Sequence, residues 1–264
     1  KNQLLNELII IDGLPGCGKT LFNAIISGMD RVELLNYTSE IENICELRYL
    51  NKITDNVACV MMQNQADLVL YETMMSRRTN FRPSDLSSAF RNINYMKYIK
   101  RLFQKGNQII PDRVKSELPI LQFATHSKFI ASEPLFHAFG NKIKFIEIVR
   151  HPLYMIIQQT FNMSRSRGTT RNFHINFNYN NNELPWLVKG WEELYLKSND
   201  VEKSIYEMAN LDKIKTNLSK SYTKYKKQIL TIPFEHFVLD PYPFIDELTK
   251  LLGTCPSNKI KKVL

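Results

Sequence analysis

Short apolar runs alternate with longer amphipathic segments along the chain. Each run is rich in β-branched or aromatic side chains, which is typical of strands buried inside a sheet. This pattern predicts five strands, at residues 8–11, 32–35, 120–125, 142–149 and 228–232.

Segments with apolar residues at helical spacing separate these runs. They predict helices over 19–26, 40–50, 57–75, 85–104, 129–139, 153–162, 183–197, 200–226 and 242–252, with a polar loop at 172–182 and a turn at 234–241. Strands that alternate with helices favour a parallel β-sheet flanked by helices on both faces. We therefore expect an α/β fold, with residues 1–264 forming a single domain.

The first apolar run leads into a glycine-rich loop and then a helical pattern. Residues 13–20, GLPGCGKT, fit the phosphate-binding P-loop pattern G-x-x-x-x-G-K-[ST]. Glycines let backbone N–H groups form an anion nest, and the helix N-terminus adds its own N–H groups. Lys19 brings a cation, and Thr20 a hydroxyl for phosphate or Mg²⁺. A glycine-rich turn that binds nothing is the alternative. Because strand, loop and helix are all present, the sequence predicts a phosphorylated nucleotide as ligand.

Composition narrows the class of protein. The chain has 35 Lys and Arg against 26 Asp and Glu, a net charge of +9 that suits an anionic ligand. A nucleic-acid partner would need this charge on one face, and we predict none. The four cysteines show neither C-x-x-C nor metal spacing and are expected to be free thiols. We find no secretory signal and no run long enough to span a membrane, and expect a cytoplasmic protein. The oligomeric state stays open.

Two further strand ends carry residues suited to an anion. His126 follows the third predicted strand, and Arg150 follows the fourth, directly before a helix that begins near Pro152. In a parallel sheet, ligands bind at the carboxyl ends of the strands. Arg150 is well placed to bind a phosphate bidentately. A structural salt bridge with Glu147 or Glu235 is the alternative.

Two blocks of sequence resemble a known family. KFIEIVRHPLYMIIQQ carries a strand, Arg150 and a Pro-initiated helix, and ILTIPFEHFVLDPYPFIDELTKLLG carries a late strand and the last helix. Together with the P-loop, and with His126 lying 24 residues before Arg150, this order resembles sulfotransferases that use 3′-phosphoadenosine 5′-phosphosulfate (PAPS), within the P-loop nucleotide-binding superfamily. The resemblance covers the P-loop block and most of 120–253. It leaves 30–119 unmatched, so that 57–118 would be a mainly helical, acceptor-side insertion.

The resemblance implies a sulfotransferase-like fold and a role for each matching residue. His126 would be the general base, and Lys19 would stabilise charge on the bridging oxygen. The residues that would bind PAPS, or its product adenosine 3′,5′-bisphosphate, are Gly13, Pro15, Gly16, Cys17, Gly18, Lys19, Thr20, Leu21, Arg150, Gln158, Arg165 and Arg167. No metal is expected. The acceptor would be a hydroxyl or amine on a carbohydrate, phenol, lipid or peptide.

The chain also departs from the family pattern. Gly16 stands where the family has a cation, Gln158 where it has a serine, and Ala124 where it has the lysine before the histidine. The late basic segment for the 3′-phosphate is missing, so either Arg165, Arg167 and Arg171 replace it or the 3′-phosphate site is weaker or incomplete. These departures leave two alternatives. One is a kinase using ATP and Mg²⁺, although no predicted strand ends in the Asp that Mg²⁺ would need. The other is a nucleotide-binding module without catalysis.

Overall fold

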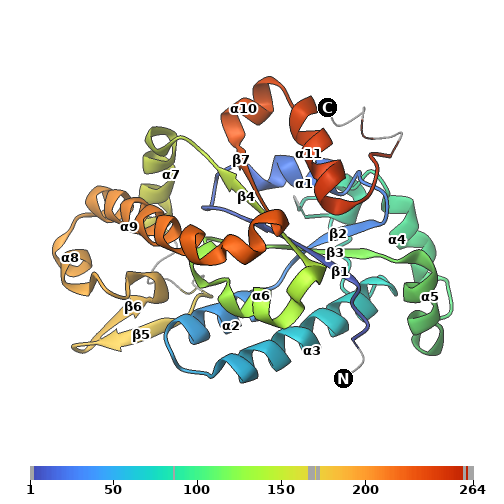
Figure 1. The fold of residues 1–264 in the computed structure, drawn as a ribbon, viewed down its shortest axis with the longest axis horizontal. Helices are drawn as coiled ribbons and strands as arrows, with labels where there is room; N and C mark the ends of the chain where they lie inside the picture. Colours follow the sequence, from blue (N-terminus) through green and yellow to red (C-terminus); the bar gives the residue numbers. More distant parts are fainter. Residues whose placement is uncertain (1–2, 86, 166–169, 171–172, 258–259, 261–264) are drawn as a thin grey trace.

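A five-stranded parallel sheet forms the centre of the molecule in the computed structural model, which describes residues 3–85, 87–165, 170, 173–257 and 260 (Figure 1). Its strands lie in the order β2-β3-β1-β4-β7, and all neighbours pair in parallel. They are β1 (Glu7–Asp12), β2 (Val32–Tyr37), β3 (Ile120–Ala124), β4 (Ile143–Val149) and β7 (Ile229–Pro233). All five predicted strands are confirmed.

Helices cover both faces of this sheet, as predicted. In β1, Leu8 and Ile10 face one hydrophobic cluster, and Ile9 and Ile11 face another. The first cluster is closed by α2 (Ser39–Tyr49), α3 (Asp55–Thr73), α6 (Glu133–Phe139) and α9 (Asp200–Ser221). The second is closed by α1 (Lys19–Ile26) and α11 (Tyr242–Leu252). A strand with both faces buried needs a continuous apolar run, which is why the strand signal was strong.

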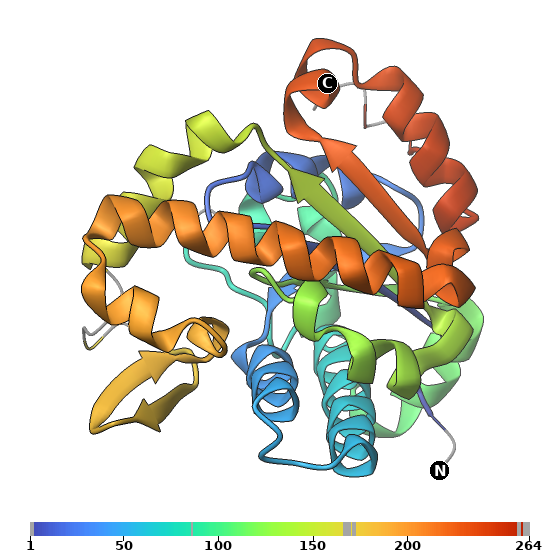
Figure 2. The same ribbon diagram turned by 60° about the vertical axis from the view of Figure 1, so that its left-hand side comes forward.

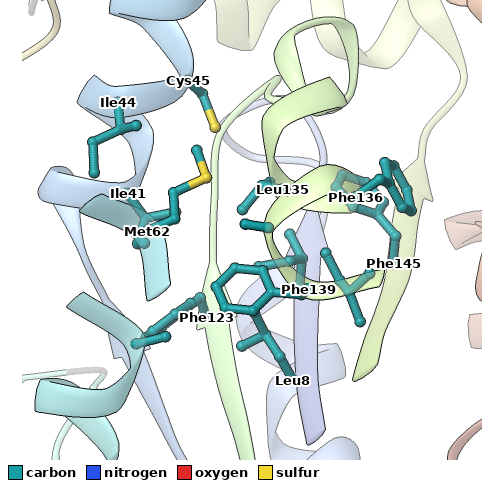
Figure 3. Packing of buried hydrophobic residues seen from close by; sticks show 14 of the residues in the cluster. Leu8, Ile41, Ile44, Cys45, Met62, Phe123, Leu135, Phe136, Phe139 and Phe145 are labelled. Atoms are coloured by element: carbon teal, nitrogen blue, oxygen red, sulfur yellow. The ribbon is translucent and has the colours of Figure 1, made fainter. Parts of the chain in front are cut away.

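Aromatic side chains fill the first cluster between the sheet and the short helix α6 (Figure 3). The ring of Phe136 lies 5.9 Å from that of Phe145, and Phe129 makes an edge contact with Phe145 at 5.4 Å. Full burial of one such side chain is worth about 1.5–3 kcal/mol, so these rings contribute strongly to the packing of α6 on the sheet.

The remaining helices connect or border the sheet. They are α4 (Tyr95–Leu102), α5 (Ile110–Glu117), α7 (Pro152–Arg165), α8 (Glu192–Lys197) and α10 (Phe234–Leu239). Figure 2 shows α9 crossing the front of the sheet, and α7 packs against α9. Within the described residues, every helix is too short or too polar to span a bilayer. Residues 57–118 include most of α3 with α4 and α5, and their part in acceptor binding stays a prediction.

The helix predicted over 85–104 is wrong in its first half. A single 3₁₀ turn (Ala89–Arg91) precedes α4, which begins at Tyr95. The side chain of Asn92 accepts a hydrogen bond from Asn94 N at 2.8 Å. Asn side chains compete with helix formation for backbone donors. The Asn92 side chain does so here, and α4 therefore begins only at Tyr95.

Residues 173–197 also differ from the prediction. The structure has an antiparallel hairpin of β5 (Asn176–Tyr179) and β6 (Asn182–Pro185) where a loop and the start of a helix were expected, and α8 begins at Glu192. Asn180 and Asn181 occupy the turn with φ of 48° and 63°. Two left-handed residues are the mark of a type I′ hairpin, and Asn tolerates them. Residues 234–239, predicted as a turn, form the short helix α10.

A buried charge cluster holds α4 against β2. Glu33 is fully buried and pairs with Arg101 at 2.7 Å and with Lys97 at 2.6 Å. Burial alone would raise the pKa of Glu33, but Lys97 and Arg101 outweigh it and lower that pKa below its ordinary value. The cluster therefore fixes α4 to β2, the strand at the edge of the sheet.

Removing Arg101 should destabilise the fold strongly. Arg101→Ala leaves the Glu33 carboxylate buried with less of its compensation, and we expect the free energy of unfolding to fall by about 3–5 kcal/mol in urea denaturation. Lys100→Ala, at an exposed position of the same helix, is the control and should change stability by less than about 0.5 kcal/mol. If Arg101→Ala and Lys100→Ala lower the free energy of unfolding equally, the buried ion pairs make no specific contribution to stability.

Candidate active site

The P-loop is packed so tightly that none of its three glycines has room for a side chain. A Cβ on Gly13 would come within 2.5 Å of Ile148 O. Gly16 and Gly18 have φ of 87° and 106°, in the left-handed region. A Cβ on Gly16 would come within 2.5 Å of Gln158, and one on Gly18 within 2.1 Å of the Phe234 ring. Side chains of α7 and α10 therefore pack directly against the loop.

Lys19 lies inside this loop. Its Nζ donates hydrogen bonds to Gly13 O at 2.6 Å and Leu14 O at 3.1 Å, and the side chain is buried. It is the first residue of α1, so the helix N-terminus and the ammonium group point to the same place. Leu21, predicted at the nucleotide, lies two residues further on and is half exposed.

Tyr37 connects the P-loop to His126. It lies at the end of β2 and is half exposed. Burial raises the pKa of Tyr37 above its ordinary value, although the nearby Thr20 side chain opposes the shift. The Tyr37 ring stacks on His126, with centroids 6.4 Å apart and planes 18° apart. The structure thus brings His126 close to the P-loop through a residue that the sequence did not single out.

Glu42 holds His126 in place. Its Oε1 accepts a hydrogen bond from His126 N at 2.5 Å and lies 3.0 Å from His126 Nδ1. Burial opposes ionisation of Glu42, but Lys128 and the hydrogen bond from His126 outweigh it and lower the pKa of Glu42 to about 2. Glu42 is therefore a carboxylate at neutral pH. Sequence reasoning missed it, because an acidic residue in a first helical turn is ordinary.

A buried ion pair and buried hydrogen bonds fix the turn that carries His126. Lys128 is fully buried, with Nζ 2.8 Å from Glu46 Oε1 and 4.7 Å from the centroid of the Trp186 ring. Asp12, at the end of β1, accepts hydrogen bonds from the backbone N–H groups of Lys128 at 3.0 Å and Phe129 at 2.9 Å. Buried and fully bonded groups of this kind have little freedom, so His126 is held rigidly.

Arg150 contacts the P-loop from the end of β4. Its Nη1 donates to Gly16 O at 3.2 Å, and its guanidinium lies 5.0 Å from the centroid of the Phe234 ring. Its Nε is buried without a hydrogen-bond partner, the Glu235 oxygen being 3.6 Å away. Of the two salt bridges considered for Arg150, the structure has the one with Glu235. Glu147 pairs instead with Lys215 at 2.7 Å.

The other predicted nucleotide-binding residues lie on α7 or beyond it. Gln158 packs over Gly16, and its neighbour Gln159, not predicted, donates to Pro15 O at 2.8 Å. Arg165 ends α7, but its side chain is outside the described part of the structure, as are Arg167 and Arg171. All assigned ligand roles stay predictions.

A kinase would need an Asp at a strand end to bind Mg²⁺. The expectation that no strand ends in Asp is wrong for β1, which ends at Asp12, but this carboxylate already accepts hydrogen bonds from Thr125 Oγ1 and from the backbone of Lys128 and Phe129. Asp67, the acidic residue beside the apolar run of the third predicted helix, lies on α3, where its Oδ1 accepts a hydrogen bond from Leu5 N at 3.0 Å.

Stability that depends on Glu42 should be lost in acid. Its folded-state pKa of about 2 lies below the ordinary 4.5, so its contribution is full above pH 4.5, declines below it and is lost at about pH 2. The difference corresponds to roughly 3 kcal/mol. Urea denaturation at several pH values should show that Glu42→Gln loses less stability than the unsubstituted chain between these limits. Glu183→Gln, exposed on β6, should behave like the unsubstituted chain; the same behaviour of Glu42→Gln would contradict the prediction.

Comparisons with known proteins identify the fold. No protein-family model and no curated protein matches the sequence. Among solved structures, the chain is similar to a sulfotransferase domain from the curacin biosynthetic pathway, with a TM-score of 0.52 and 14% identity over 97% of this chain and 77% of that one. Weaker likenesses are to a sulfotransferase domain from a Synechococcus olefin synthase (TM-score 0.46, 14% identity, 98% of this chain and 78% of that one) and to a Mycobacterium tuberculosis sulfotransferase (TM-score 0.47, 9% identity, 98% and 70%). The resemblance seen in the sequence is thus confirmed at the level of architecture: the chain has the sulfotransferase fold.

Proposed function

We propose that this protein is a sulfotransferase that moves a sulfuryl group from PAPS to the hydroxyl or amine of an acceptor. The observation that carries the proposal is the joint placement of three groups at one edge of the sheet. These are Lys19 within the P-loop, Arg150 against Gly16, and His126 on the Glu42 carboxylate. Each is the residue to which the family resemblance gives a role, and the fold supports that assignment.

The donor would bind along the P-loop and the end of β4. Backbone N–H groups at the start of α1, with Lys19, suit the 5′-phosphosulfate. Arg150 has a buried Nε without a hydrogen-bond partner and contacts Gly16, which suits the 3′-phosphate at the other end of the same nucleotide. Arg150 would then exchange its long contact with Glu235 for a charge-assisted hydrogen bond to phosphate.

PAPS, when bound, would supply the sulfuryl group and a stable leaving group, adenosine 3′,5′-bisphosphate. His126 would take the proton from the acceptor as the new bond to sulfur forms and the bond to the bridging oxygen breaks. Glu42 supports this role, because a proton on Nδ1 is donated to its carboxylate, which leaves Nε2 as the basic nitrogen. Lys19 would neutralise charge that develops on the bridging oxygen.

The kinase alternative rests on Lys19, which stands where a nucleotide kinase has its P-loop lysine. It gives no role to the segment that begins at Phe234, whose ring packs on Gly18. A non-catalytic module would bind nucleotide without turnover.

Calorimetric titration separates these classes. We expect adenosine 3′,5′-bisphosphate to bind without metal, and ATP with Mg²⁺ to bind weakly; the reverse order would favour a kinase.

Arg150→Ala should remove the preference of the binding site for nucleotides that carry a 3′-phosphate. Loss of a charge-assisted hydrogen bond should weaken adenosine 3′,5′-bisphosphate by roughly ten- to a hundredfold, with little effect on ADP. Arg82→Ala, in an exposed loop, is the control and should change neither affinity. Equal losses for both nucleotides would remove the assigned role.

His126→Ala should slow turnover strongly without affecting donor binding. General-base catalysis contributes roughly 10²–10⁴-fold, so we expect a fall of that size with any acceptor that is turned over. The affinity for adenosine 3′,5′-bisphosphate should stay unchanged. His137→Ala, on α6 and paired with Asp55, should retain full activity. Unchanged turnover in His126→Ala would show that another group takes the proton.

A further inference from the structure

Helix α4 faces the protein with its polar side and solvent with its apolar side. On the inner side, Tyr98 and Arg101 are buried against β2, where both bond to the Glu33 carboxylate. On the outer side, Met96 is 47% exposed, and Phe103, which follows the helix directly, is 86% exposed. A surface helix ordinarily has the opposite arrangement, because burial of its apolar face holds it on the protein. The apolar side of α4 is therefore left uncovered by the described part of the chain.

The uncovered apolar residues lie next to one another. Met96, Ile99 and Phe103 stand at positions i, i+3 and i+7, which places them on one face of the helix. At the start of the helix, the Tyr95 ring lies 6.2 Å from that of Phe90 in the preceding 3₁₀ turn, and both rings are exposed. Single exposed apolar side chains are common, whereas a contiguous group of them marks an interaction site.

Positive charges accompany this apolar face. Residues 87–111 contain five basic residues and no acidic one. Two of the five, Lys97 and Arg101, pair with Glu33 inside the protein. The other three are exposed, and no acidic side chain in the described ranges pairs with them; they are Arg91, Lys100 and Lys105. The outward side of this segment is thus both apolar and cationic.

We propose that the α4 surface, by which we mean the outward-facing side chains of residues 90–105, binds peripherally to a membrane that carries anionic lipids. Met96, Ile99 and Phe103 would enter the boundary between headgroups and acyl chains, and the cations would lie among the anionic headgroups. An apolar helix face flanked by Lys and Arg is the pattern by which helices bind in the plane of a bilayer. Helix α4 lies at the margin of the molecule, beside α5, which suits contact with a flat surface (Figure 1). This inference does not depend on the proposed function.

A protein partner is the rival occupant of this surface. Lysine is depleted in protein–protein interfaces, and fixing its long side chain costs conformational entropy. Lys100 stands four residues after Met96 and three before Phe103, so a protein that covered both apolar residues would also cover its ammonium group. At a bilayer, the ammonium group can reach the headgroups while its methylene groups stay in the apolar layer. The position of Lys100 therefore favours a lipid surface.

Vesicle co-sedimentation with the whole chain tests the proposal. We expect binding to vesicles of equimolar phosphatidylserine and phosphatidylcholine, and little binding to vesicles of phosphatidylcholine alone. Met96→Ser combined with Phe103→Ser should weaken binding to the mixed vesicles by at least about tenfold, because less apolar surface enters the bilayer. Leu239→Ser, 84% exposed on α10, is the control and should bind like the unsubstituted chain. Thermal unfolding checks that each variant is folded.

The cations are tested with a second pair of substitutions. Lys100→Ala combined with Lys105→Ala should weaken binding to the mixed vesicles by roughly five- to thirtyfold, because each removes one charge close to the anionic surface. Lys226→Ala combined with Lys227→Ala removes the same net charge from exposed positions after α9, and it should have a much smaller effect.

Several results would overturn the proposal. One is that the unsubstituted chain does not bind the mixed vesicles, and another is that it binds phosphatidylcholine alone equally well. If the variant with Met96→Ser and Phe103→Ser binds the mixed vesicles as tightly as the unsubstituted chain, the attraction comes only from the net charge of the protein. A dimer seen by analytical ultracentrifugation without lipid, and lost in this variant, would assign the surface to a second copy of the chain.

Discussion

The carboxylate of Asp12 is the constraint on which the candidate site depends. It lies 1% exposed at the end of β1, directly before the P-loop, and it accepts hydrogen bonds from Thr125 Oγ1 at 2.8 Å and from the backbone of Lys128 and Phe129. Thr125 N also donates to Ile11 O, and Ser127 N to Gly13 O. The turn that carries His126 is thus attached to the first residues of the P-loop, and neither can move without breaking buried hydrogen bonds.

A second set of buried charges gives this turn its orientation. Lys128 lies between Glu42 and Glu46, and Glu46 also binds His174 Nδ1 at 3.1 Å and Ile175 N at 2.7 Å. Burying such charges is costly unless each is paired, and here the pairing joins α2, the His126 turn and the chain just before the β5–β6 hairpin. The same groups that stabilise the fold therefore set the direction of the His126 ring.

The departures from the family pattern have a counterpart in the structure. The resemblance implies a cation where this chain has Gly16, and the guanidinium of Arg150 reaches the carbonyl of Gly16 from β4. Gln158, in place of the family's serine, packs over the same glycine. A basic group and an amide thus lie beside the loop, although neither belongs to it.

The sequence by itself determined the five strands, the helices on both faces and the P-loop, because each is encoded in a local period or a contiguous motif. Where local signals were weak, as at Asn180 and Asn181, it missed a hairpin. The tertiary structure alone decided that Glu42 holds His126, 84 residues away in the chain, and that Arg150 pairs with Glu235 while Glu147 pairs with Lys215. Such pairings depend on strand order and helix packing, which bring distant residues together without leaving a local pattern at either one.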